Sequence, residues 1–483
     1  MVIVLLKVMS KKSRGKGKKN SITPVRDDFF SAISFKEIND YFCMMRIFSS
    51  FRIDNVNDFK AKLLDWSRDF NEVCILDSNG YSKRFNSPTC SFRYDYLAAI
   101  GSVNKMGQDE QGNLEAIGKF SGLAGDWLFG HLSYDIKNET ENLSSSHPDR
   151  IGFPLAEFFV PGYIFVIDGN NLQVGWLKSL SGEVEINRLV KEIDSLTIRQ
   201  LKAGGSGPVK EVMTKKEYLE AVKRVMGHIG RGNIYEVNIC QEFFSSIKSF
   251  DPGQAWLSLI EESPTPFSCY YNLGDKYLLC ASPERFMKRT GNRIISQPIK
   301  GTAARGNNVL EDEQLLRKLA TDPKERAENV MITDLVRNDL SVIAERGSVK
   351  VDELCGIYPF PRVFQMQSTI SALIRPKTSL VDIIRALFPM GSMTGAPKIR
   401  AMEIIEQYER SRRGLYSGAV GYITPQNDFD FNVVIRSIQY NRTSEALSFM
   451  VGGAITSLSD PEKEFAECML KAGAIMKILG TGR

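Results

Sequence analysis

The sequence predicts an α+β fold with largely antiparallel sheets. Short β-rich runs come in hairpin-like groups, and amphipathic segments come in groups of their own, without strict alternation of strand and helix. The 483 residues are 43% apolar, so the chain can bury a large core, in one large domain or in two to three ordinary ones. No internal repeat is visible in the sequence.

Residues 1–44 form a basic leader. Seven Lys and Arg residues and no acid stand in residues 1–19, and removing them from the formal charge of +5 leaves about −2 for the rest. We therefore expect no nucleic-acid partner for the globular part. The apolar run at the start, "MVIVLL", is too short for a signal peptide, and it precedes the positive charges instead of following them. We predict a disordered leader with an over-long start, the alternatives being a nucleic-acid or membrane tail.

Hydropathy and cysteine usage indicate the cellular compartment. No apolar stretch reaches the roughly 18 residues that span a bilayer, so we expect no membrane partner and a cytoplasmic location. The eight cysteines are scattered without a C-x-x-C pair, which favours buried free thiols over disulfides or zinc. All three histidines (His131, His147 and His228) precede residue 230, so later chemistry must use Lys, Glu, Asp, Arg or hydroxyls.

The first elements are predicted from Met45 onward. "MRIFSSFRIDNVNDFKAKLLDW" is typical of a strand followed by an amphipathic helix. β-rich runs then alternate with Asn/Ser/Gly loops to about residue 200, and the Gly/Ser/Pro cluster at 202–210 is typical of a linker. We predict an N-terminal region at 45–205 and a second region, the catalytic domain, at 206–483.

The second region opens with a helix, because Thr214 and Glu217 form a capping box ahead of "YLEAVKRVMGHI". Strands follow at "YEVNICQEFF", "FSCYYNL", "YLLCASP" and "RIISQPIK". Helices are predicted at "ERAENVMITDLVRNDLSVIAERG", "SLVDIIRALF" and "PKIRAMEIIEQYERS". The last strands are "YSGAVGYIT", "DFNVVIRSIQY" and "LSFMVGGAIT", and the last helix starts at "DPEKEF".

One lysine and one glutamate are candidates for chemistry. "SQPIKGTAARG" places Lys300 between a Pro-Ile strand end and a Gly-Thr turn, where a lysine is commonly a solvated charge. The sharper hypothesis is an amine aimed into a cleft, where desolvation keeps part of it neutral and nucleophilic. In "CASPERF", Glu284 ends a strand and is a candidate general acid, or an edge carboxylate that pairs with Arg285.

Two glycine turns are candidates for anion binding. "FPMGSMTGAPKIRAME" places Ser392 ahead of a helix that begins near Pro397 and Lys398, where backbone N–H groups can face an anion. Its spacing is not that of a phosphate-binding Walker A loop, and a plain loop into a helix is the alternative. "MVGGAITSLSD" is a second glycine turn after a strand and could expose its N–H groups likewise.

Two E-x-x-E pairs are candidates for a metal site. Glu325 and Glu328 share one face of a predicted helix, and Glu464 and Glu467 share one face of another. Four carboxylates from two helices suit a hard divalent ion such as Mg²⁺. The same spacing recurs at other positions, where a solvated helix face explains it.

Together these pieces resemble one family. "GNIYEVN", "ASPERF", "PIKGTAARG", "ERAENVMITDLVRNDL", "FPMGSMTGAPKIRAMEIIE", "YSGAVGY" and "GGAITSLSDPEKEFAECMLKA" resemble, in order, motifs of the chorismate-utilising enzymes. That family contains anthranilate, aminodeoxychorismate, isochorismate and salicylate synthases. The resemblance spans roughly residues 214–480, with a weaker match upstream at "WLFGHLSYDI". It implies two large, mostly antiparallel β-sheets packed together with helices on the outside.

The residue at position 300 favours one branch of that family. Anthranilate synthases carry alanine in the "PI-x-GT" slot, whereas the common aminodeoxychorismate synthases carry lysine. The resemblance to their component I implies that Lys300 attacks C2 of chorismate while the C4 hydroxyl leaves with a proton from Glu284. Ammonia then adds at C4 and expels the lysine. The implied reaction is an amino transfer of the transaminase class, which gives 4-amino-4-deoxychorismate for folate and p-aminobenzoate synthesis.

The resemblance also implies the remaining roles. Glu328 and Glu467 would bind Mg²⁺ directly, with Glu325 and Glu464 ordering its waters. Arg436 and Tyr416 would hold the enolpyruvyl carboxylate, which suits a guanidinium fork. The remaining substrate-binding positions are Ser392, Gly453, Ala454, Gly301, Thr302, Gln365 and Lys398.

At two positions this chain departs from the family pattern in a way that bears on which product it forms. Isochorismate and salicylate synthases place a water-activating lysine where this chain has Glu236, so a hydroxylating role loses its base. Many relatives have histidine at the position of Gln365, and that histidine serves the aromatising loss of pyruvate in anthranilate synthases. Both departures favour amination at C4.

No glutaminase motif is visible, so we expect ammonia from a separate glutamine amidotransferase subunit, or free ammonia in its place. The alternatives are anthranilate synthase component I, or a non-catalytic paralogue that binds chorismate or tryptophan. "VCILDSNGY" around Ser78 is only loosely similar to the inhibitor-binding strand of anthranilate synthases, and we expect no tryptophan site or a purely structural one.

Overall fold

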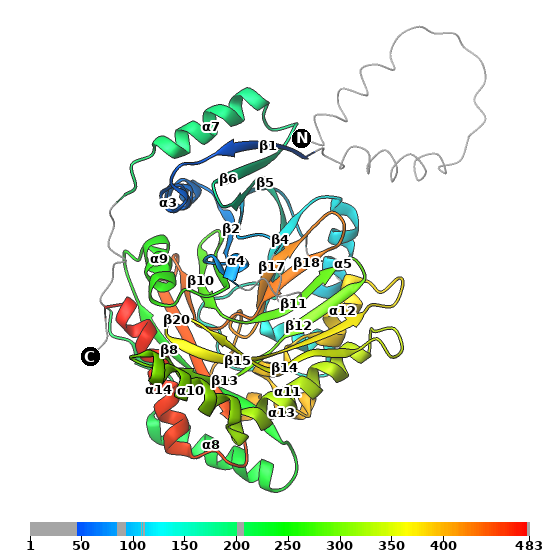
Figure 1. Cartoon of the computed structure of the whole chain (residues 1–483), viewed down its shortest axis with the longest axis vertical. Helices are drawn as coiled ribbons and strands as arrows, with labels where there is room; N and C mark the ends of the chain where they lie inside the picture. Colours follow the sequence, from blue (N-terminus) through cyan, green and yellow to red (C-terminus); the bar gives the residue numbers. More distant parts are fainter. Residues whose placement is uncertain (1–45, 85–92, 108, 110–111, 200–206, 481–483) are drawn as a thin grey trace, which may run out of the picture. The chain divides into compact units, whose positions relative to one another are not determined.

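The computed structural model describes residues 46–84, 93–107, 109, 112–199 and 207–480 (Figure 1). The predicted leader and residues 202–206 of the predicted linker lie outside this range. Hydrogen bonds join the twenty strands of the described part into one network, and every strand pairing in it is antiparallel. The predicted antiparallel α+β class is confirmed.

The network consists of two sheets that share β5 (Ala156–Asp168). The first sheet runs, in spatial order, through β1 (Arg46–Arg52), β6 (Asn171–Leu177), β5, β3 (Tyr96–Lys105), β2 (Glu72–Asp77), β9 (Phe267–Leu273), β10 (Lys276–Ser282), β19 (Ser437–Asn441), β20 (Ala446–Ile455) and β8 (Glu236–Ser246). The short strands β7 (Lys210–Glu211) and β16 (Gly395–Ala396) pair with β8 at its edge.

The second sheet carries the strands around Lys300. It runs from β5 through β4 (Leu128–Leu132), β17 (Ala419–Ile423), β18 (Phe429–Asn432), β11 (Arg285–Thr290), β12 (Arg293–Gln297) and β15 (Val363–Leu373), with β13 (Ile299–Ala304) and β14 (Lys350–Pro359) also paired to β15. Ala156–Phe159 of β5 pair with β4, and Phe159–Ile167 pair with β3, so one strand connects the two sheets.

Alternation along the strands shows that the sheets pack face to face. In β10, Leu278 and Cys280 enter a core that also contains Phe129 of β4 and Val420 of β17, which belong to the other sheet. Tyr277 and Leu279, the alternate residues, point to the opposite face and a different core. A period of two places successive side chains on opposite faces, so both faces of this strand are buried.

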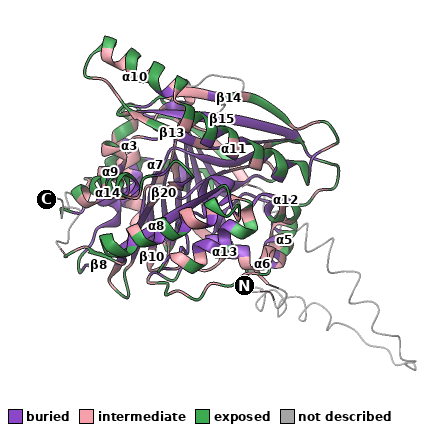
Figure 2. Cartoon of the chain, turned by 90° about the horizontal axis from the view of Figure 1, so that it is seen from below, coloured by how far each residue is buried: buried purple, intermediate pink, exposed green. Residues whose placement is uncertain are grey.

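Helices cover the two outer faces. The outer face of the first sheet packs against α3 (Val56–Trp66), α7 (Glu183–Ser195), α8 (Lys215–Gly230), α9 (Pro252–Glu262), α13 (Lys398–Tyr408) and α14 (Pro461–Ile478). The second sheet packs against α5 (Asn113–Ala124), α11 (Pro323–Ser341) and α12 (Leu380–Leu387), and α10 (Val309–Thr321) covers β13 and β15. The short helices are α4 (Tyr81–Arg84) and α6 (Lys137–Thr140). Figure 2 shows exposed residues on the outward faces of α8, α10 and α11.

Local signals set the helix starts. Thr214 caps α8 through the predicted capping box, since its side chain accepts from the Glu217 amide and the Glu217 side chain bonds back. The two helices with paired glutamates start alike: an Asp caps α11 and α14, and a Pro takes the first helical position. The first predicted strand and helix are β1 and α3, as expected from the sequence.

Strands from both predicted regions pair with each other, β2 with β9 and β4 with β17, so the sheets cross the predicted boundary at 205/206. The division into 45–205 and 206–483 stays a prediction. Six cysteines within the described ranges are free and buried, as the sequence predicts (Cys74, Cys240, Cys269, Cys280, Cys355 and Cys468). Among the described helices, none is long and apolar enough to cross a bilayer.

Candidate active site

Lys300 lies within a bulged strand. The sequence placed it between a strand end and a turn, but it is part of β13, whose register against β15 shifts between Ile299 and Thr302. Gly301 makes the bulge feasible, because its φ of +99° suits glycine and a Cβ there would lie 3.2 Å from Glu325 Oε2. Bulges re-aim side chains, which explains how a strand lysine is directed into the site.

The charge state of Lys300 differs from the prediction. Its Nζ lies 2.8 Å from Glu236 Oε1, and the side chain is 9% exposed. Burial alone lowers the pKa of the amine, but the ion pair with Glu236 and the charges of Glu328 and Glu284 outweigh it, so the pKa is raised. The prediction that desolvation keeps the amine partly neutral is wrong, because the ion pair with Glu236 and the charges of Glu328 and Glu284 favour the protonated amine.

Glu284 has the properties of a proton donor. It lies between β10 and β11, is 3% exposed, and accepts a hydrogen bond of 2.6 Å from Ser392 Oγ. Burial raises its pKa to about 7, against the opposing effects of the Ser392 hydrogen bond and the Lys300 charge. A carboxyl group that titrates near neutrality can donate and recover a proton during turnover. Arg285, its proposed alternative partner, pairs with Asp430 at 2.9 Å.

Ser392 is carried by the first predicted glycine turn. The single-turn 3₁₀ helix Gly391–Met393 leads into β16, where Ala396 pairs with Glu236 of β8. This pairing brings the turn beside the strand that carries the Lys300 partner. Lys398 follows, but its Nζ bonds to Asp339 Oδ2 at 2.5 Å and to the Leu387 carbonyl. The structure therefore pairs the Lys398 amine with Asp339 and the Leu387 carbonyl, and not with Lys300 or Glu284.

Arg436 is a guanidinium that forms no ion pair with the residues the structure describes. It is half-buried, precedes β19, and burial lowers its pKa. No carboxylate within the described ranges forms an ion pair with it, so it is suited to an anionic ligand. The backbone of Ser417 donates to the Val434 carbonyl at 2.9 Å and thereby links the Arg436 and Tyr416 segments. Tyr416 is buried, with its hydroxyl 3.7 Å from Cys240 Sγ.

The second glycine turn is not a turn. Gly453 and Ala454 lie inside β20 and pair with Ile239 and Asn238 of β8. The preceding Gly452 is needed for close packing, because a Cβ there would lie 2.2 Å from the Ile239 carbonyl. The predicted turn is therefore wrong, whereas the display of N–H groups stays a prediction, since β19 pairs with β20 only at Ala446–Ser448. A Cβ on Gly453 would lie 3.4 Å from Glu464 Oε2, so this strand does reach the paired glutamates.

Two of the four glutamates form ion pairs with Lys324, and the charges of all four act on it. Its Nζ lies 3.8 Å from Glu328 Oε1 on α11 and 3.5 Å from Glu464 Oε1 on α14. Burial raises the pKa of Glu328 to about 7, and its Oε1 accepts no hydrogen bond from any described residue. Glu464 is 5% exposed, whereas the Glu467 side chain is 53% exposed and pairs with Lys471 at 2.8 Å.

These glutamates fit a divalent ion by chemistry, though they do not form a finished ligand set. Carboxylate oxygens are the ligands that Mg²⁺ prefers, and Glu328 has a buried oxygen that accepts no hydrogen bond from a described residue. Within the described residues, however, no three acidic, cysteine or histidine side chains are close enough to hold a metal ion. The Lys324 ammonium supplies positive charge there, so a metal ion would have to replace it.

Other buried polar atoms near Lys300 also lack partners. Gln365 and Gln367 lie on β15 opposite β13, and one side-chain polar atom of each accepts or donates no hydrogen bond within the described structure. The same holds for Glu236 Oε2. Buried polar groups are nearly always satisfied in folded proteins, so such a concentration indicates that a polar ligand or water completes the site.

Two residues that position this group were missed from the sequence. Asn329 donates to the carbonyls of Lys300 and Met366, each at 3.2 Å, and thereby holds β13 and β15 beside α11. Arg413 is buried, pairs with Glu409 at 2.6 Å, and donates to the carbonyls of Met393 and Asn238. Their signals were weak, because Asn329 looks like a polar helix residue and Arg413 belongs to a charge run.

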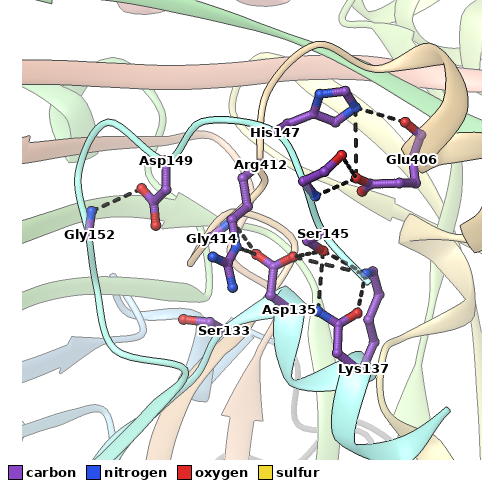
Figure 3. A network of polar contacts seen from close by, with 12 residues as sticks. Ser133, Asp135, Lys137, Ser145, His147, Asp149, Gly152, Glu406, Arg412 and Gly414 are labelled. Atoms are coloured by element: carbon purple, nitrogen blue, oxygen red, sulfur yellow. Dashed lines mark hydrogen bonds and ion pairs between the residues drawn. The ribbon is translucent and has the colours of Figure 1, made fainter. Parts of the chain in front are cut away.

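A second network holds the segment that leads to Tyr416. Figure 3 shows Asp135 bonded to this segment and to Ser145. Asp135 Oδ2 accepts from the Gly414 amide at 3.0 Å and pairs with Arg412, while Ser145 Oγ donates to Oδ1 at 2.5 Å. Lys137, 1% exposed, donates to Ser145 at 2.9 Å. The "WLFGHLSYDI" motif thus supports the catalytic region from the N-terminal part of the chain.

Ser78 lines a cavity of about 50 Å³ between the two sheets. The lining also includes Tyr94, Phe267, Tyr422 and Asn432. The lining of this cavity includes neither Lys300 nor Glu284. Its walls combine aromatic rings with a serine and an asparagine.

Known proteins resemble this chain over most of its length. The chorismate binding enzyme family matches residues 76–477. A Bacillus subtilis protein named aminodeoxychorismate synthase component 1 is 34% identical over 361 residues, 72% of this chain and 76% of the relative. A Synechocystis protein named anthranilate synthase component I-like is 35% identical over 361 residues, 74% and 73% of the two chains.

Solved structures share the fold. Anthranilate synthase component I from Streptococcus pneumoniae aligns over 98% of this chain and 96% of its own, with a TM-score of 0.69 and 22% identity. The isochorismate synthase MenF from Escherichia coli aligns over 90% and 94%, with a TM-score of 0.68 and 17% identity. These identities support the fold, and the match across residues 76–477 supports the family. The chain belongs to the chorismate binding enzymes.

Proposed function

We propose that this chain is the chorismate-aminating component of an aminodeoxychorismate synthase. It would convert chorismate to 4-amino-4-deoxychorismate, with a covalent intermediate on Lys300. The observation that carries the proposal is the placement of a buried lysine on the β13 bulge. Its amine forms an ion pair with Glu236, and the charge of Glu284 also acts on it. A solvated lysine would have needed neither the bulge nor the surrounding carboxylates.

Lys300 would act as the nucleophile and Glu284 as the general acid. The Lys300 amine forms a bond to C2 of the ring as the bond between C4 and its hydroxyl breaks, and Glu284 gives that hydroxyl the proton with which it leaves as water. Ammonia then bonds to C4, and the bond from C2 to Lys300 breaks. A proton lost from the new amine returns to Glu284, so the enzyme ends as it began.

Arg436 and the four glutamates would bind the substrate and its metal ion. Arg436 would hold the enolpyruvyl carboxylate, because its guanidinium has no carboxylate partner among the described residues. Glu328 and Glu464, with Glu325 and Glu467, would hold Mg²⁺ in place of the Lys324 ammonium. A bound Mg²⁺ would supply the positive charge that a ring carboxylate needs beside these glutamates.

Ammonia would come from a separate glutamine amidotransferase subunit. Several relatives carry the name aminodeoxychorismate synthase component 1, including those from Salmonella typhimurium and Escherichia coli at 40% and 39% identity over about half of this chain. A component 1 implies another component. The location we propose is the cytoplasm, and the pathway is that of folate and p-aminobenzoate.

The product assay separates this function from its nearest rival. Relatives named anthranilate synthase component 1 are also similar to this chain, at 33% identity for the Thermus thermophilus protein. Purified protein with chorismate, ammonium and Mg²⁺ should give no anthranilate fluorescence, and p-aminobenzoate should form once an aminodeoxychorismate lyase is added. Direct anthranilate fluorescence would favour the rival, and no chorismate consumption would favour a non-catalytic paralogue.

A further inference from the structure

Glu236 is the one acidic side chain that the structure places within ion-pair distance of Lys300 among the described residues. Its Oε1 lies 2.8 Å from Lys300 Nζ, and its side chain is 1% exposed. Its other oxygen, Oε2, is buried and accepts no hydrogen bond from the described part of the chain. The backbone of Glu236 is fixed by its pairing with Ala396 of β16, which follows the turn that carries Ser392.

This contact raises a chemical problem for the proposed covalent step. A lysine amine attacks carbon only when it has lost its proton, because the nitrogen lone pair must be free. Glu236, Glu328 and Glu284 all favour the protonated amine, which carries no lone pair. Some group in contact with Nζ must therefore accept a proton before the bond to C2 can form.

We infer that Glu236 is the catalytic base of Lys300 and stores its proton while lysine is bonded to the substrate. This inference rests on the proposed function, and it assigns the glutamate a task distinct from those of Glu284 and Arg436. The assignment follows from direct contact with a reacting atom and from burial, which excludes bulk water as the acceptor. The buried Oε2 accepts no hydrogen bond from a described residue, so the carboxylate can become a neutral acid without breaking another such contact.

The proton count closes over the cycle. A proton moves from Lys300 Nζ to Glu236 Oε1, and the neutral amine bonds to C2 while the C4 hydroxyl leaves with the Glu284 proton. In the second half, ammonia bonds to C4 and the electron pair of the bond to C2 returns to Nζ. Glu236 then gives its proton back to Nζ, and the excess proton on the new amine goes to Glu284. Chorismate and ammonia have become 4-amino-4-deoxychorismate and water.

A purely structural ion pair is the competing explanation, and it predicts different behaviour. If Glu236 only neutralised Lys300, an uncharged isostere would affect folding or substrate binding more than bond formation. If Glu236 is the base, the isostere would leave binding nearly intact and slow the formation of the covalent adduct. General-base contributions are typically about 10²- to 10⁴-fold in rate.

The experiment measures adduct formation without ammonia. Wild type, Glu236→Gln and Glu236→Asp are mixed with chorismate and Mg²⁺, quenched over time and weighed intact by mass spectrometry, while chorismate binding is measured by calorimetry. Glu242→Gln is the matched control, since Glu242 is a buried carboxylate of the same strand that bonds to Ser411 and Ser448 instead. The control should form adduct at the wild-type rate.

We expect Glu236→Gln to bind chorismate within about threefold of wild type and to form adduct at least about 100-fold more slowly. Glu236→Asp should recover part of the rate, because it keeps the carboxylate. Adduct formation by Glu236→Gln at the wild-type rate would overturn the inference and leave the proposed function intact. If Glu236→Gln does not fold, Glu236→Asp decides, and a folded Asp variant without adduct overturns the inference. A wild type that forms no adduct refutes the covalent route itself.

Discussion

The Ser392 hydroxyl donates a hydrogen bond of 2.6 Å to Glu284 Oε1, and both side chains are buried. This bond joins the turn before β16 to the start of β11, two segments far apart in the sequence. It also acts on the proton of Glu284, because a hydroxyl donor stabilises the charged carboxylate and opposes the effect of burial.

Replacing Ser392 with Ala should shift the pH dependence of turnover. The general acid acts in its protonated form, so activity is present below the Glu284 pKa of about 7 and falls as pH rises through it. Without the Ser392 hydrogen bond the pKa rises further, and the falling limb of the kcat profile should move up by about one pH unit, or ~1.4 kcal/mol. A limb that stays in place or moves to lower pH would contradict this role.

Replacing Arg436 with Met should raise the free energy of unfolding and weaken chorismate binding. The guanidinium is desolvated without a carboxylate partner within the described residues, so its removal relieves an unfavourable burial. Chorismate affinity should fall by roughly 30-fold or more, equivalent to ~2 kcal/mol for a charge-assisted contact. Thermal unfolding and calorimetry measure the two effects, with exposed Arg442→Met as the control. Unchanged chorismate affinity would refute the anion-binding role.

Replacing Glu328 with Gln should raise the Mg²⁺ concentration needed for half-maximal activity by about 10- to 100-fold. The physical reason is the loss of a buried carboxylate charge whose oxygen has no hydrogen bond to a described residue. Glu403→Gln is the control, because Glu403 belongs to an E-x-x-E pair on an exposed helix face and pairs with Arg400. A Mg²⁺ titration in which both variants behave alike would argue against a metal role for Glu328.

His131 should make stability depend on acid. Its ring is fully buried between the Tyr271 hydroxyl and the Pro154 carbonyl, and burial lowers its pKa from an ordinary 6.5 to about 4. Between pH 6.5 and 4 the unfolded chain binds a proton that the folded chain refuses, so stability falls as pH falls, by about 3 kcal/mol in all. In chemical denaturation, His131→Gln should lose correspondingly less stability over this window. Parallel pH curves for the two proteins would show that His131 does not titrate as described.

Much of the fold followed from local signals in the sequence. The capping box at Thr214 and the Asp-Pro starts of α11 and α14 depend only on neighbouring residues, so the pattern predicts them well. The glycines of β20 were wrongly predicted to form a turn. Gly452 is required because the Ile239 carbonyl of β8 approaches it closely, and only the pairing of two distant strands reveals this.

The site shows the same division. Motifs identified Lys300, Glu284 and Ser392, and the structure brings Ser392 to Glu284 and pairs the segment after Ser392 with the strand of Glu236, the partner of Lys300. The charge of Lys300 was not predictable, because it depends on Glu236, which comes from another strand. Lys398 looked suited to an anion, but Asp339 of α11 lies against it, and a helix partner of that kind leaves no mark near Lys398 in the sequence.

The central claim is that Lys300 becomes bonded to the substrate, and one measurement tests it most directly. Wild-type protein is incubated with chorismate and Mg²⁺ in the absence of ammonia, and the peptide that contains Lys300 is mapped by mass spectrometry beside the Lys300→Ala variant. We predict a chorismate-derived adduct on Lys300 in wild type, and loss of C4 amination with a slow drift to anthranilate-type product in the variant. An unmodified Lys300 in wild type, together with undiminished C4 amination by Lys300→Ala, would contradict the account.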